Sequence, residues 1–82
     1  MIDRMVFDRL ETRMDAAEKR YGPFASTHEA LGVIVEEYDE LRAAIHLNAL
    51  AAVQGECLDL AAVCIRLAQD LERKETSARS VK

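Results

Sequence analysis

The sequence is short of aromatic residues and of residues that interrupt helices. Its 82 residues include two Phe, two Tyr and no Trp, together with three Gly and one Pro. Ala and Leu dominate instead, a composition typical of packed helices. A chain of this length forms one small domain that buries only about 60–65% of its unfolded surface. We therefore expect a single all-α domain of marginal stability, with no internal repeat.

The chain also lacks a basic excess and a long apolar run. Its net charge is −4, whereas a nucleic-acid polymer needs a basic stripe, so we expect no such partner. A nucleotide substrate stays compatible with this charge, because a metal ion can bring phosphates to carboxylates. No apolar run approaches the roughly 20 residues that span a membrane, and no secretory signal opens the chain. We therefore expect no membrane partner and a cytoplasmic location.

Cysteine is scarce as well. Cys57 and Cys64 are the two thiols, and they stand seven residues apart in an apolar helical stripe. Residues in such a stripe are usually buried, and free thiols are typical of a reducing compartment. We expect both to be buried thiols of a cytoplasmic protein.

The spacing of apolar residues predicts a first helix over residues 3–21 and a second that follows it closely. Gly22-Pro23 should end the first helix, because proline disfavours helical backbone in the residue before it. Ser26 and Glu29 then have the spacing of a capping box, in which Ser26 caps the second helix. This helix should run to about residue 45 or 46.

The third helix is expected to be the longest, from about residue 49 to 73, with Asn48 as its cap. The boundary before it is weak, because residues 46–52 contain neither Gly nor Pro. A single bent helix is therefore an open alternative to a hairpin. A bent helix would separate acidic residues that a hairpin brings together.

The third helix is apolar on two sides. One seam recurs at spacings of three and four residues, namely Leu50, Val53, Cys57, Leu60, Cys64, Leu67 and Leu71. A second apolar row flanks it, so this helix needs neighbours on both sides, and a chain of three helices supplies too few. We expect a helical hairpin plus an N-terminal helix that completes a four-helix-bundle core by homo-oligomerisation, as a dimer or tetramer. Residues 1–75 would form the domain, and residues 76–82 a flexible tail.

Two pairs of acidic residues have the spacing of one helix face. Glu37 and Glu40 form one pair, and Glu56 and Asp59 form the other. Such pairs are common in a chain with 15 acids, but these two interrupt apolar columns, where an acid needs a compensating partner. In a hairpin the four carboxylates would converge. Oxygen ligands without His or Cys favour Mg²⁺, with Mn²⁺ as the alternative.

These acids form the patterns E-E-x-x-E, from Glu36 to Glu40, and E-x-x-D, from Glu56 to Asp59. With the preceding H-E-A-L-G-V-I-V, they resemble the signature of the all-α nucleoside triphosphate pyrophosphohydrolases. This family includes MazG-like proteins, the all-α dUTPases and phosphoribosyl-ATP pyrophosphohydrolase. The resemblance covers roughly the middle half of the chain. It implies that the metal ligands are Glu37, Glu40, Glu56 and Asp59, and that Glu36 is an additional acid.

The resemblance also implies a reaction. Carboxylate-bound Mg²⁺ would neutralise charge on a triphosphate, and water would release pyrophosphate and a nucleoside monophosphate. Glu36 or Glu37 would orient or deprotonate that water. Arg66 lies seven residues beyond Asp59 on the same helical column. It would either contact a phosphate or pair with a carboxylate. The chain has no obvious later basic helix for the phosphates.

The alternative function belongs to a different class. The apolar seam of the third helix would also suit a non-catalytic helical oligomer that binds another protein. The carboxylate cluster would then be structural. Both acidic pairs are complete, which favours the enzyme.

Overall fold

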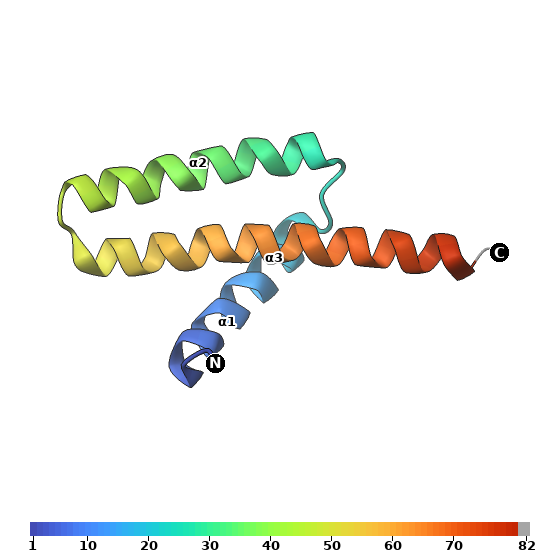
Figure 1. Cartoon of the computed structure of the whole chain (residues 1–82), viewed down its shortest axis with the longest axis horizontal. Helices are drawn as coiled ribbons and strands as arrows, with labels where there is room; N and C mark the ends of the chain where they lie inside the picture. Colours follow the sequence, from blue (N-terminus) through green and yellow to red (C-terminus); the bar gives the residue numbers. More distant parts are fainter. Residues whose placement is uncertain (81–82) are drawn as a thin grey trace.

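The computed structural model describes the backbone of residues 1–80 and the side chains of residues 1–74 (Figure 1). Over this range the chain forms three helices and no strand: α1 (Arg4–Tyr21), α2 (Thr27–His46) and α3 (Leu50–Ser80). The expected all-α fold is thus confirmed. α2 runs back along α3 as a hairpin, while α1 crosses α3 obliquely, as Figure 1 shows. The alternative of one bent helix is wrong.

The first two helices begin and end near the expected residues. Asp3 caps α1, because its carboxylate accepts hydrogen bonds from the backbone N–H groups of Met5 and Val6. Ser26 caps α2, since its hydroxyl accepts a hydrogen bond of 3.1 Å from the Glu29 N–H. Glu29 completes a variant of the capping box by accepting a hydrogen bond from the N–H of residue 25.

Asn48 was expected to cap α3. In the structure it ends α2 instead. Its backbone is left-handed, with φ of 54°, a conformation that Asn tolerates better than most residues. The Asn48 N–H donates to the Ile45 carbonyl, and the Ala49 N–H donates to the Ala44 carbonyl. These two bonds form a Schellman motif, which reverses the chain without Gly or Pro. The first carbonyl of α3 to accept a helical bond is that of Ala49.

The small core consists of two clusters, both built on α3. In one cluster, Leu10 of α1 packs against Leu58 and Ala62 of α3. In the other, Phe24 and Ala30 pack against Val63. α1 and α2 therefore occupy different faces of α3. Since burial of apolar area is the main favourable term in folding, α3 is the element that holds both other helices in place.

The expected burial of Cys57 and Cys64 is wrong, because both side chains are exposed. α1 packs on the face of α3 that carries Leu58, and α2 packs on the face that carries Val63. The row of the two cysteines lies between these faces and is left open. Leu50 and Leu71 of the same row are also exposed.

The third helix is longer than expected. It continues to Ser80, beyond the end anticipated near Arg73. The expected flexible tail over residues 76–82 concerns residues whose side chains lie outside the described part of the chain. Over that part, no helix combines the length and apolar character that crossing a bilayer requires.

Gly22 should be required for stability, whereas Gly32 should not. Gly22 has φ of 68° and ψ of −163°, a region that is essentially restricted to glycine, so Gly22→Ala should cost on the order of 1–3 kcal/mol. Gly32 lies inside α2, and no atom lies within 4 Å of a Cβ added there. Gly32→Ala should therefore stabilise the fold by up to about 1 kcal/mol. Urea denaturation of both variants measures the two effects, and equal midpoints would contradict this account.

Candidate metal centre

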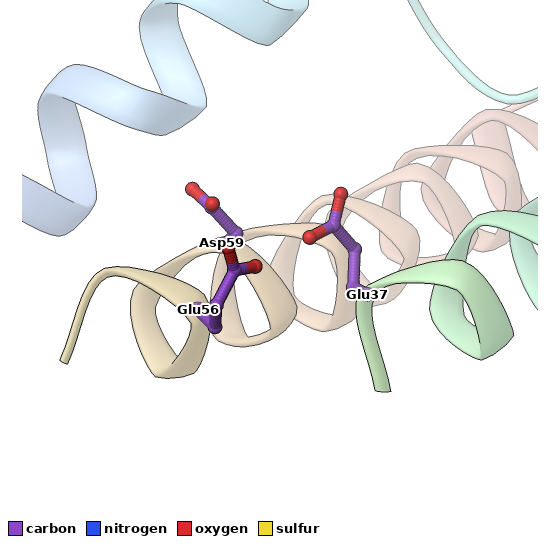
Figure 2. A group of neighbouring side chains, drawn as sticks. All are labelled: Glu37, Glu56 and Asp59. Atoms are coloured by element: carbon purple, nitrogen blue, oxygen red, sulfur yellow. The ribbon is translucent and has the colours of Figure 1, made fainter. Parts of the chain in front are cut away.

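The α2–α3 hairpin brings three of the predicted ligands together. Glu37 comes from α2, and Glu56 and Asp59 come from adjacent turns of α3. Figure 2 shows their carboxylates extending into the space between these helices, on the side where α1 lies. One oxygen atom from each residue lies within 4.8 Å of the other two. The antiparallel arrangement is what makes residues separated by about twenty positions in the sequence neighbours.

The cluster contains charged oxygen atoms that the protein itself does not satisfy. All three side chains are half-buried. Oε2 of Glu37 and Oε2 of Glu56 are inaccessible to solvent and have no hydrogen-bond partner among the described residues. A buried carboxylate oxygen without a partner is costly. A bound cation or a proton would remove this cost.

The electrostatics of the cluster favour protonation when no metal is bound. Burial, followed by the negative charges of Glu40, Asp59 and Glu56, raises the pKa of Glu37 from its ordinary 4.5 to about 7. Burial also raises the pKa of Glu56, with further contributions from Glu40 and Asp59, while the Arg13 charge acts in the opposite direction. Near neutral pH, Glu37 is therefore partly protonated, and a bound metal ion would displace this proton.

The remaining two predicted acids lie beside this triad. Glu40 is exposed and is not among the residues whose oxygens lie within 4.8 Å of one another. Its carboxylate is still close enough to contribute to the raised pKa of Glu37 and of Glu56. Glu36 is exposed and lines the same pocket as Glu37.

Arg13 of α1 is a site residue that the sequence analysis missed. Its Nε lies 2.7 Å from Oδ1 of Asp59, in an ion pair and hydrogen bond that join α1 to α3. Its Nη2 is also the nearest atom to a Cβ built on Gly55, at 3.5 Å. The available signal was the position of Arg13, which lies beside Leu10 and Met14 on the side of α1 that packs against α3. Only the crossing of α1 over α3 shows which carboxylate it meets.

Arg66 is buried and does not pair with a carboxylate among the described residues. It is 4% exposed, and its Nη2 donates a hydrogen bond of 2.9 Å to the Gly22 carbonyl. Its guanidinium lies over the Phe24 ring, 4.5 Å from the ring centre. Within the described residues it forms no ion pair, so the alternative of pairing with a carboxylate is wrong. Its Nε is buried without a hydrogen-bond partner there.

Asp70 is a second residue that the sequence analysis missed. It is buried, and its Oδ2 accepts a hydrogen bond of 2.9 Å from the Phe24 N–H. Its other oxygen lies 3.5 Å from Nη1 of Arg73. Asp70 therefore fixes the segment between α1 and α2 on α3. The only available sequence signal was its spacing: Asp70 follows Val63 by seven residues and Arg66 by four, so the three lie on one side of α3.

An open pocket of about 740 Å³ adjoins the carboxylate cluster. Glu37 and Asp59 line it together with Phe24 and Arg66. Residues of α1, α2, α3 and the segment after α1 all contribute to it. Such a concave site with converging charged groups has the features of a ligand-binding site.

The cluster fits a hard divalent cation. Its ligands are carboxylate oxygens, the donors that Mg²⁺ prefers. The three oxygens lie within 4.8 Å of one another, so small side-chain rotations would bring them around one ion. Glu37, Glu56 and Asp59 would hold the ion, and Glu37 and Glu56 each have one buried oxygen without a partner among the described residues.

Comparisons of the chain with known protein families, curated proteins and solved structures found no match. The family resemblance therefore depends on the E-E-x-x-E and E-x-x-D patterns themselves.

Without metal, stability should fall as pH rises through the range in which Glu37 titrates. The folded protein binds this proton more tightly than the unfolded chain, so the free energy of unfolding should decrease between about pH 4.5 and 7. Glu37→Gln should flatten this decrease. Urea denaturation in chelator over this pH range measures the effect. Asp39→Asn, an exposed change on another side of α2, is the control, and a slope that Glu37→Gln leaves unchanged would contradict the assignment.

Proposed function

We propose that this protein is a Mg²⁺-dependent nucleoside triphosphate pyrophosphohydrolase of the MazG-like type. The observation that carries the proposal is the meeting of Glu37 with Glu56 and Asp59, in which two buried carboxylate oxygens lack partners. These residues come from the two motifs that resemble the family signature. Their convergence supports the proposal, because solvated acids would not need to converge.

The chain's own groups have distinct tasks in this reaction. Glu37, Glu56 and Asp59 hold the cation, and Glu40 is placed to join them. The bound Mg²⁺ supplies charge neutralisation for the phosphate oxygens. Glu36 faces the same pocket without belonging to the triad, so it is the carboxylate best placed to orient and deprotonate the attacking water, with Glu37 as the other candidate. The products are pyrophosphate and a nucleoside monophosphate.

In this proposal the protein is cytoplasmic and forms a homodimer or homotetramer. Exposed apolar residues recur every seven positions on two helices, and this spacing keeps them on one face of each helix. On α2 they are Leu31, Tyr38 and Ile45, and on α3 they are Leu50, Cys57, Cys64 and Leu71. Pairing of these stripes between two copies would produce a four-helix-bundle core. The same stripes also favour the alternative of a non-catalytic protein-interaction module.

Mg²⁺ should stabilise the wild-type protein and have much less effect on Glu56→Gln. A ligand that binds only the folded state raises its stability, and this substitution removes one ligand while keeping the side-chain volume. In chelator, the variant should be at least as stable as the wild type, because one repelling charge is absent. Melting curves with millimolar Mg²⁺ and with chelator measure both effects. Identical Mg²⁺ responses of the two proteins would exclude Glu56 from the site.

Pyrophosphate release from a panel of nucleoside triphosphates tests the activity itself. We expect Mg²⁺-dependent release by the wild type and a loss of orders of magnitude in Glu56→Gln. Asp39→Asn should retain the activity. A wild type that binds Mg²⁺ but hydrolyses no nucleotide would favour the interaction module.

The apolar stripes should determine the oligomeric state. Light scattering at low micromolar concentration should show a dimer or tetramer, and Tyr38→Lys should shift it toward the monomer by placing a charge in the middle of the α2 stripe. Asp39→Lys introduces the same side chain beside the stripe and should leave the assembly intact. A monomeric wild type would contradict the expected assembly.

A further inference from the structure

Arg66 is a buried cation for which the described residues provide no anion. Its nearest candidate on α3, Asp70, is one turn away and is engaged by the Phe24 N–H and by Arg73. A buried charge without a partner of opposite sign is costly. The stacking on Phe24 and the bond to the Gly22 carbonyl fix the guanidinium but leave its charge uncompensated. An anionic ligand in the adjoining pocket would compensate it.

Arg13 is a second cation on the same pocket, and it is held differently. Its single ion pair among the described residues is with Asp59, one of the three clustered carboxylates. The Arg13 side chain is about one-third exposed, at 34%, so it borders both Asp59 and the open pocket. A cation bound to Asp59 would neutralise part of the charge that attracts Arg13. Loading of the carboxylate cluster would therefore weaken the bond between Arg13 and Asp59.

We infer that Arg13 and Arg66 form an anion subsite for the polyphosphate group of the substrate, with Arg66 as the fixed arm and Arg13 as the arm that Asp59 releases. This inference rests on the proposed function. Arg66 follows Asp59 by seven residues, or about 10.5 Å along α3, and both line the pocket. The polyphosphate would lie along α3, from the carboxylate cluster toward Phe24. Arginine suits this task because its planar fork donates two parallel hydrogen bonds to phosphate.

The exchange of Arg13 between Asp59 and phosphate couples two binding events. Without an anion, Arg13 competes with Mg²⁺ for Asp59, so Arg13→Gln should bind Mg²⁺ at least as tightly as the wild type. With an anion present, Arg13 stabilises the loaded site, so the same substitution should weaken binding. These opposite signs distinguish a residue that exchanges partners from one that only supports the fold.

Calorimetric titration of the full chain with inorganic tripolyphosphate in excess Mg²⁺ tests the subsite without requiring catalysis. Arg13→Gln should weaken binding roughly 10- to 100-fold, as expected for loss of a charged hydrogen bond. Arg9→Gln is the matched control, because Arg9 lies one turn away on α1, is exposed and bonds only Gln54 among the described residues. It should change binding by less than about twofold. Titration with Mg²⁺ alone measures the opposite effect.

Arg66→Lys tests the fixed arm, because it keeps the charge and removes the fork. We expect a loss of affinity similar in size to that of Arg13→Gln, with a melting curve as a check on folding. If Arg66→Lys does not fold, the Arg13 and Arg9 comparison decides the proposal alone. Equal losses in Arg13→Gln and Arg9→Gln, or no binding of tripolyphosphate by the wild type, would overturn it.

The inference and the proposed function fail in different ways. If the protein binds tripolyphosphate in an Arg13-dependent way but hydrolyses no nucleotide, the anion subsite is supported and the proposed hydrolase activity is contradicted. If the wild type hydrolyses a nucleotide, and Arg13→Gln and Arg9→Gln have equal tripolyphosphate affinity and equal KM, the hydrolase activity is supported and the anion subsite is contradicted.

Discussion

The packing of two helices on different faces of α3 is the constraint on which the rest of this structure depends. α1 is held through Leu10 against Leu58, and α2 is held through Ala30 against Val63. Over the described residues, α1 and α2 pack on α3 and not on each other. The space between them is therefore bordered by three helices but filled by none. The pocket and the carboxylate cluster lie in this space.

Apolar packing holds together carboxylates that repel one another. Burial and neighbouring charges raise the pKa of Glu37 and of Glu56, so the cluster destabilises the empty protein near neutral pH. A fold of this size has only a small free energy of unfolding. Groups that lower stability in this way are characteristic of binding sites, where a ligand supplies the missing interaction. Arg13 partly compensates the cluster by its bond to Asp59.

The segment after α1 lines the pocket and holds Arg66 in place. Gly22 adopts a backbone conformation that other residues avoid, and its carbonyl accepts a hydrogen bond from Arg66. Phe24 is held by Asp70 through its N–H and lies beneath the Arg66 guanidinium. The turn that redirects the chain into α2 thus also fixes a buried cation beside the carboxylates. Fold and site share these few residues.

The sequence by itself determined the helices, because apolar periodicity, the Ser26 cap and Gly22-Pro23 are local signals. It also predicted that the Glu37–Glu40 and Glu56–Asp59 pairs would converge once a hairpin formed, since residues three apart share a helix face. Three of these four carboxylates do so. Tertiary structure decided the rest. The hairpin depends on the left-handed Asn48, which reads in sequence as a cap for the next helix. The partner of Arg13, the burial of Arg66 and the exposure of Cys57 all depend on where α1 crosses α3. No local pattern specifies that crossing, because it follows from which of several apolar rows on α3 each neighbour covers.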